Sequence, residues 1–194
     1  SRDNASKSDT KASAILSAST STQTPEETID ASYQELNSAL AADLLERLKE
    51  NSPLFFEQAV LDLLVKMGYG GSRQDAARRV GQSGDGGIDG VINEDRLGLD
   101  AVYIQAKRWQ QPISAGSLRD FTGSLEANRS TKGVFITTST FTKDARDHVG
   151  RVQKRIILID GEELAQLMID FDIGVTARTT YVLKKIDEDY FSEE

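Results

Sequence analysis

The second half of the sequence alternates strand-like and helix-like segments, and this alternation constrains the fold more than any other feature. Two short strands are expected at about 88–93 and 99–108, on either side of the turn-forming sequence NEDRLG. The segments that follow are a helix near 115–128, the strand KGVFITTS (132–139), a helix over 142–152, the strand RIILID (155–160) and a helix over 161–171. Strands that alternate with helices form a sheet covered by helices. The sequence therefore predicts an α/β fold with a central mixed β-sheet flanked by helices.

The N-terminal part divides into a polar segment and two helices. Residues 1–32 are rich in Ser, Thr, Ala and Asp and contain almost no large apolar residue, so we interpret them as a disordered linker or tail. Apolar residues at helical spacing then predict a helix over 33–51. A second helix is expected to begin at Pro53, with Ser52 as its N-cap. We therefore predict one domain, residues 33–194, preceded by a linker.

The cysteine and histidine content limits the possible chemistry. The chain has no cysteine and one histidine, His148, which excludes disulfides, cysteine-ligated zinc and histidine-rich metal clusters. A bound metal would therefore have oxygen ligands. No apolar run approaches the roughly 20 residues that a bilayer-spanning helix needs, and we expect a cytoplasmic protein.

Charge is unevenly distributed along the chain. The formal net charge is −8, which disfavours binding to nucleic-acid phosphates. The net charge of Lys, Arg, Asp and Glu is −5 for residues 1–66, +3 for 67–160 and −6 for 161–194. The middle segment has a net positive charge, so it is the part suited to bind a polyanion. A solvated surface of mixed charge explains the same distribution equally well.

Glu57 lies on the apolar side of the second predicted helix. On a helical wheel it falls between the directions of Leu61 and Leu64, inside the apolar stripe. A carboxylate that faces the core is costly unless it is paired or bound to a cation. Glu57 is therefore either part of an ion pair with an arginine or a cation ligand.

The strand at 99–108 presents an amide and an ammonium group together. Side chains alternate between the two faces of a strand, so Gln105 and Lys107 share one face, about 7 Å apart. Tyr103 and Trp109 belong to the same face. They could pack against DNA sugar or against a neighbouring helix, and we favour packing against a helix. The opposite face is apolar and is expected to face the core. The partner strand begins at Asp89, which would bring a carboxylate to the same edge.

The sequence GDGGIDG (84–90) concentrates four glycines and two aspartates immediately before the first strand. A phosphate-binding P-loop is excluded because no glycine is followed by Lys and then Ser or Thr. A calcium loop starting at Asp85 would place Gly87 and Arg96 where oxygen ligands are required. A turn with a purely structural role remains open, since glycine readily adopts positive φ.

Four separated motifs occur in an order that is typical of one nuclease family. They are Phe56-Glu57 on the second helix, GDGGIDG, QAKRW (105–109) and KGVFITTSTFT (132–142). This order resembles the catalytic domain of Mrr-type restriction endonucleases, a branch of the PD-(D/E)xK nuclease superfamily. The resemblance covers about residues 50–175.

The resemblance assigns a role to each candidate residue. Asp89 matches the first acidic metal ligand of the family, Gln105 the second ligand position and Lys107 the catalytic lysine. Glu57 matches the helix glutamate that often completes such sites. Two positions differ from the wider superfamily: Ile88 stands where proline is frequent, and Gln105 is neutral where Asp or Glu is usual. The glutamine is characteristic of the Mrr branch.

The family implies a PD-(D/E)xK restriction-endonuclease-like fold and magnesium-dependent cleavage of double-stranded DNA. Asp89, Gln105 and Glu57 would hold the Mg²⁺ ion, and Lys107 would orient the attacking water and stabilise developing charge. The implied role is type IV restriction, the attack on methylated foreign DNA, by a homo-oligomer (dimer or higher) for double-strand cleavage. Target recognition would reside in an N-terminal winged-helix domain outside this chain, and Asp85 stays an outer candidate for the site.

Two alternatives fit the same residues. One is a nuclease of the same fold that acts in repair or on branched DNA. The other is a non-catalytic DNA-binding module with a degenerate nuclease site, for which the neutral Gln105 is the best support. Activity on junction substrates would indicate the first, and metal titration by calorimetry would discriminate the second.

Overall fold

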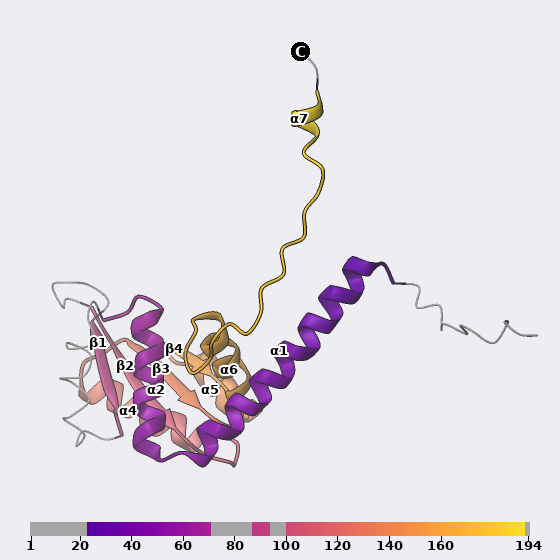
Figure 1. Ribbon diagram of the computed structural model, residues 1–194. Helices are drawn as coiled ribbons and strands as arrows, with labels where there is room; N and C mark the ends of the chain where they lie inside the picture. The colour runs from indigo at the N-terminus through magenta and orange to yellow at the C-terminus, as the bar shows by residue number, and fades with distance from the viewer. Residues whose placement is uncertain (1–22, 71–86, 94–99, 193–194) are drawn as a thin grey trace, which may run out of the picture. The chain divides into compact units, whose positions relative to one another are not determined.

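The structure, a computed structural model, describes residues 23–70, 87–93 and 100–192 (Figure 1). Its helices are α1 (Pro25–Glu50), α2 (Pro53–Lys66), α4 (Ala115–Ala127), α5 (Lys143–Arg151), α6 (Gly161–Asp170) and the short α7 (Glu188–Phe191). Its strands are β1 (Gly90–Asn93), β2 (Ala101–Lys107), β3 (Lys132–Thr137) and β4 (Arg155–Ile159). The chain divides into two compact units after Leu36, within α1, and all these strands belong to the second unit.

The four strands form one mixed sheet in the order β1-β2-β3-β4. β1 pairs antiparallel with β2, and the pairs β2–β3 and β3–β4 are parallel. Each parallel connection contains a helix, α4 and then α5, which is how a chain returns to begin the next parallel strand. The predicted mixed sheet and the predicted helices and strands of the second half are confirmed, with ends that differ by a few residues.

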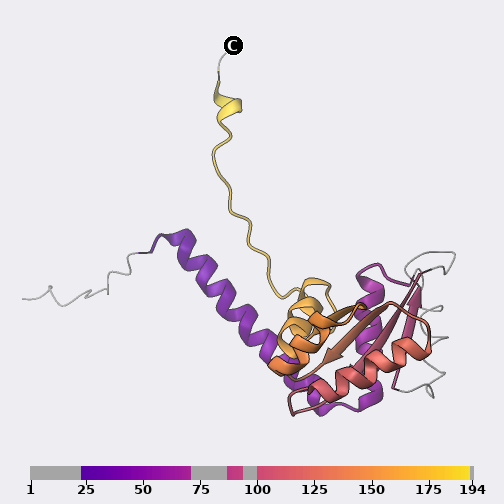
Figure 2. The same cartoon turned by 180° about the vertical axis from the view of Figure 1, so that it is seen from behind.

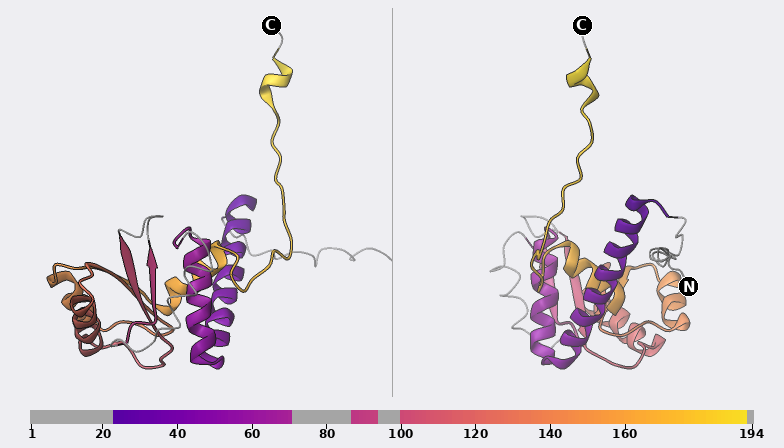
Figure 3. Two further views of the ribbon diagram at one scale, coloured as in Figure 1. Left: turned by 90° about the vertical axis from the view of Figure 1, so that its left-hand side faces the viewer. Right: turned by 45° about the vertical axis from the view of Figure 1, so that its right-hand side comes forward.

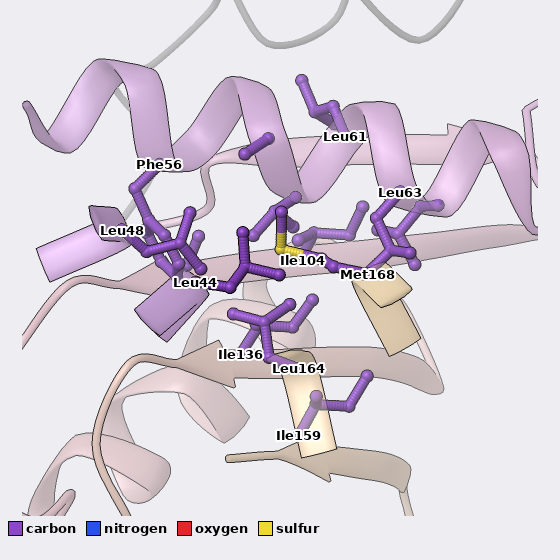
Figure 4. Close-up of a cluster of buried hydrophobic side chains, with 14 of the residues drawn as sticks. Leu44, Leu48, Phe56, Leu61, Leu63, Ile104, Ile136, Ile159, Leu164 and Met168 are labelled. Carbon is purple, nitrogen blue, oxygen red and sulfur yellow. The ribbon is translucent and has the colours of Figure 1, made fainter. Parts of the chain in front are cut away.

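Helices cover both faces of this sheet (Figures 2 and 3). On one face, α2, α6 and the last turns of α1 enclose a core with Leu48, Phe56, Leu63, Ile104 and Leu164 (Figure 4). On the other face, α4 and α5 pack over a second cluster around Phe121, Phe135 and Phe141, whose rings meet edge to face. The sheet is therefore a middle layer between two sets of helices.

The start of α1 differs from our prediction. The helix begins at Pro25, not near residue 33, so residues 25–32 of the predicted linker are helical. The reason is a capping box: Thr24 N–H donates to the Glu27 carboxylate (2.8 Å), and Glu27 N–H donates to Thr24 Oγ1 (3.2 Å). Residues 1–22 of the predicted linker lie outside the described residues.

The start of α2 follows the expected chemistry. Ser52 has an extended backbone and its hydroxyl accepts from Phe55 N–H at 3.2 Å, while Pro53 occupies the first helical position. Gly68 follows the C-terminal end with φ of +99°. No helix in the part of the chain that the structure describes is long and apolar enough to cross a membrane.

Gly133 provides a test of the packing between β3 and α4. A Cβ at Gly133 would lie 2.7 Å from Phe121 Cζ and 3.0 Å from Leu125 Cδ1. We expect Gly133→Ala to lower the free energy of unfolding by about 1–3 kcal/mol, because the Phe121 ring is held against Phe135 and cannot move without cost. Urea denaturation followed by circular dichroism measures this change.

Gly123 supplies the matched control. It lies on the exposed side of α4, and a Cβ there meets nothing within 4 Å. Gly123→Ala should therefore stabilise the protein by about 0.5–1 kcal/mol through helix propensity alone. Equal effects of the two substitutions would contradict the tight packing of β3 against α4.

Candidate active site

Asp89 is fixed between the first two strands. It directly precedes β1, and its N–H donates to the Ile104 carbonyl at 2.8 Å. Its carboxylate Oδ2 in turn accepts from Ala106 N–H at 2.7 Å. Both backbone and side chain of Asp89 are thus tied to β2 on either side of Gln105, so the predicted approach of Asp89 to this strand is confirmed.

Gln105 is bound to the glycine run through its amide. The side chain is 6% exposed, and Nε2 donates to the Gly87 carbonyl at 2.5 Å. Only the amide nitrogen can donate to a carbonyl, so the amide oxygen is left for another partner. Gly87 has φ of +91°, and a Cβ there would lie 2.6 Å from Gln105 Nε2. Glycine is required at this position both by the backbone conformation and by the close approach of the amide.

Glu57 projects from α2 towards the start of β1. It is half-buried, and it lines the same small hollow between α2 and the β1–β2 pair as Asp89 does. The arginine ion pair that we considered for Glu57 does not occur among the described residues. Among the described residues, the Glu57 carboxylate therefore shares this hollow with the Asp89 carboxylate and has no arginine as counter-ion.

The pKa values of both carboxylates in this hollow are raised. Burial raises the pKa of Asp89, against the lowering effects of the Ala106 hydrogen bond and of the Lys107 charge. Burial and the nearby Asp89 charge raise the pKa of Glu57, and the Lys107 charge acts in the opposite direction. Lys107 is thus close enough to act on both acids. The structure brings Glu57, Asp89 and Lys107 together. Gln105 is hydrogen-bonded to Gly87, two residues before Asp89.

Both faces of β2 are covered. Ile104 and Ala106 belong to the α2 side, whereas Tyr103 packs against the cluster on the α4 side. The predicted packing of Tyr103 is confirmed. Trp109 follows the end of β2 and is 44% exposed, so its predicted burial against a helix is wrong.

Three hydroxyl groups that the sequence analysis did not select hold the chain beyond β2. Thr137 Oγ1 donates to the Lys107 carbonyl (2.8 Å), Thr138 Oγ1 to the Trp109 carbonyl (2.9 Å) and Ser139 Oγ to the Gln110 carbonyl (3.1 Å). Thr137 is fully buried. The signal was the run of hydroxyl residues in the TTS sequence after a buried strand, since buried hydroxyls need partners. These bonds fix the backbone from which Lys107 projects.

Arg108 links the same region to the end of α1. Its Nη1 donates to the Lys49 carbonyl in the last turn of that helix, where a positive charge is also favoured by the helix dipole. The remaining candidate, Asp85, lies outside the described residues.

Sequence comparisons show the family of this chain. Residues 48–168 match the family profile Mrr_cat, described as restriction endonuclease. The chain is 48% identical over 167 residues to a type IV methyl-directed restriction enzyme, EcoKMrr, from Escherichia coli strain K12, with 86% of this chain and 54% of the relative covered. The chain thus spans about half the length of that relative.

A solved structure supports the fold independently. The DNA modification-dependent restriction endonuclease AspBHI superposes with a TM-score of 0.51 over 72% of this chain and 36% of its own, at 20% identity. The mixed sheet between helices is the architecture of the restriction-endonuclease-like fold. The chain belongs to the Mrr-type restriction endonuclease catalytic family.

Replacement of Asp89 by asparagine tests the electrostatic cost of the site. A carboxylate whose pKa is raised by folding destabilises the folded state when it is ionised, and this cost grows as pH rises from the ordinary value of 3.8 through the raised pKa. The asparagine side chain would keep an oxygen to accept from Ala106 N–H. We therefore expect Asp89→Asn to melt at a higher temperature than the parent at neutral pH without divalent cations, and to lose that advantage towards pH 3.8.

Thermal melts across this pH range, recorded with EDTA, measure the difference. The matched control is Asp120→Asn, because Asp120 is exposed on α4 and its replacement should change the melting temperature little at any pH. A parent protein more stable than Asp89→Asn at neutral pH in EDTA would contradict the raised pKa.

A pair of glycine substitutions tests the contact between Gln105 and the glycine run. Gly68 and Gly87 both have positive φ, but a Cβ at Gly68 meets nothing within 4 Å. Gly68→Ala should cost about 1–2 kcal/mol of unfolding free energy from the backbone alone. Gly87→Ala should cost about 1–3 kcal/mol more, because Gln105 must move from a buried position. Equal costs, measured by urea denaturation, would mean that the Gln105 amide does not occupy this position.

Proposed function

We propose that this chain is the catalytic domain of a metal-dependent endonuclease that hydrolyses phosphodiester bonds in double-stranded DNA. The observation that carries the proposal is the convergence of Glu57 and Asp89 in one hollow, with the Lys107 charge acting on both. Family membership supports the same reaction class, and restriction endonucleases are generally metal-dependent. We assign Asp89, Gln105, Lys107 and Glu57 as the catalytic site.

The donor set fits a hard divalent cation, and we propose Mg²⁺. Asp89 and Glu57 supply two carboxylates whose mutual repulsion a cation would relieve, and the Gln105 amide presents its oxygen because its nitrogen is bound to Gly87. Magnesium suits a site with few carboxylates because it retains several water ligands. When bound, the ion would neutralise phosphate charge and lower the pKa of a coordinated water.

The protein groups have separate tasks in this proposal. Asp89 is the principal ligand, because hydrogen bonds to β2 fix both its backbone and its carboxylate. Glu57 approaches from α2 and binds the cation directly or through water. Lys107 orients the attacking water and stabilises the negative charge that develops on the phosphate in the transition state. The hydroxyl of Thr137 holds the Lys107 carbonyl for this task, and the hydroxyl of Thr138 holds the carbonyl of Trp109, two residues further on.

We further propose that the complete enzyme is a type IV restriction enzyme, acting in the cytoplasm on methylated foreign DNA. The support is the 48% identity to a methyl-directed relative that is bacterial and about twice as long as the matched part. Selection of the modified base belongs to residues outside the matched half. Two copies of the chain would supply one site for each DNA strand.

One other function is favoured by a specific observation. Among the described residues, no group of three or more acidic, histidine or cysteine side chains forms a metal site. A non-catalytic DNA-binding module would explain that sparse set. Conversion of supercoiled plasmid to nicked or linear DNA with Mg²⁺, and not with EDTA, would support catalysis; folded protein that binds DNA but never cuts it would support the module.

Lys107→Ala tests whether Lys107 takes part in catalysis or is only a charge on the surface. We expect the variant to keep its fold and its DNA and metal binding, and to cut at least about a hundredfold more slowly, the scale of losing one preorganised electrostatic donor. The measurement is single-turnover plasmid cleavage at saturating protein, with calorimetry for Mg²⁺. Lys66→Ala is the control, because Lys66 is an exposed lysine at the end of α2. A Lys107→Ala variant that cuts at the parent rate would remove Lys107 from the mechanism.

A further inference from the structure

The C-terminal segment, residues 179–192, carries an unusual concentration of exposed apolar side chains. Their exposures range from 67% to 87%, and the residues are Tyr181, Val182, Leu183, Ile186, Tyr190 and Phe191. Isolated exposed apolar residues are common, but six within eleven positions are a concentration of the kind that marks an interaction site. The chain by itself does not bury this segment.

β4 offers an incomplete sheet edge. Among the described residues, β4 pairs on one side only, with β3. An unpaired edge presents free backbone donors and acceptors that another extended segment can use. Ile157, in the middle of β4, is 46% exposed even though its neighbours Ile156 and Ile159 are buried. The edge is therefore both unpaired and apolar.

An apolar groove adjoins this edge on the α2 side of the sheet. It has a volume of about 350 Å³ and crosses all four strands, with Met67, Tyr69, Ile92, Val102, Val134 and Ile157 among its lining residues. Lys132, which is paired with Asp100 (3.2 Å), and Arg155 also line the groove. A ligand for this surface would be apolar and extended.

The C-terminal segment has that character. Its sequence TTYVLKKI (179–186) is rich in residues that favour strands. As a strand it would place Tyr181 and Leu183 on one face and Val182 and Ile186 on the other. A strand added to this sheet needs apolar side chains on both faces, because helices cover both faces.

We propose that the C-terminal segment of one copy of this chain adds as a strand to the β4 edge of a second copy, with its apolar side chains over the groove at Ile157. Every copy carries both the segment and the edge, so two copies can exchange segments reciprocally and close a symmetric dimer. This inference rests on the proposed pairing of two copies and deepens it. Its test measures mass rather than cleavage, so its failure is distinguishable from a failure of the nuclease assignment.

The first experiment compares the 194-residue chain with a truncation that ends at residue 178, by size-exclusion chromatography with light scattering. We expect the mass of two chains for the full chain and of one chain for the truncation, with unchanged circular dichroism. Ile157→Glu should also give the mass of one chain. Leu54→Glu is the matched control, because Leu54 is 73% exposed on α2, away from the segment and the groove, and its replacement should leave the dimer intact.

A mixture tests the exchange itself. The truncated chain keeps its β4 edge, and the Ile157→Glu chain keeps its C-terminal segment, so the two should associate with each other at concentrations where each alone has the mass of one chain. Absence of this mixed species would overturn the proposal. A full chain that has the mass of one chain, or a truncation that keeps the mass of two, would overturn it as well.

Discussion

The hydrogen bond from Ala106 N–H to the Asp89 carboxylate is the contact on which the candidate site depends. It is made by the backbone of β2 between Gln105 and Lys107, so it places the carboxylate against the residues with which it must cooperate. Because the donor belongs to a central strand paired on both sides, it moves only if the sheet moves. The position of Asp89 is therefore set by the fold and not by side-chain flexibility.

This placement has an electrostatic cost that the fold only partly offsets. The Ala106 hydrogen bond and the Lys107 charge both favour ionised Asp89, yet burial outweighs them and its pKa is raised. The approach of Glu57 adds like-charge repulsion. Carboxylates held together in this way are typical of sites whose function requires a cation, because the ligand removes a strain that the protein alone retains. Stability and function thus oppose each other within the few residues that join α2, β1 and β2.

The sequence was sufficient for features that depend on local chemistry. The Ser52 cap of α2, the order of strands and helices after residue 100, and the apolar-side position of Glu57 all follow from residue type and spacing. The start of α1 was also encoded locally, in the reciprocal bonds of Thr24 and Glu27, but the lack of apolar residues in that stretch suggested a linker. Hydrophobic periodicity detects packed helices better than capped, solvated ones.

Features that depend on tertiary contacts could not be predicted in the same way. A strand that alternates polar and apolar residues predicts one buried face, yet β2 is central and both its faces are covered. Gln105 is therefore buried, and Tyr103 packs against the cluster on the α4 side. The hydrogen bond from the Thr137 hydroxyl to the Lys107 carbonyl also depends on the parallel register that places the two residues opposite each other. No local sequence pattern specifies that register.

The neutral Gln105 is explained by these contacts. A glutamate at this position would add a third negative charge next to two acids whose pKa values are already raised. It would also lose the N–H group that donates to the Gly87 carbonyl, and a carboxylate oxygen would face a carbonyl oxygen at the same distance. The amide performs two tasks that a carboxylate cannot combine, since its nitrogen anchors the turn that leads to Asp89 while its oxygen remains available to a cation. Gln105 therefore fits an intact site as well as a degenerate one, because the same side chain that lowers the number of charges also anchors the turn that leads to Asp89, which we propose as the principal ligand.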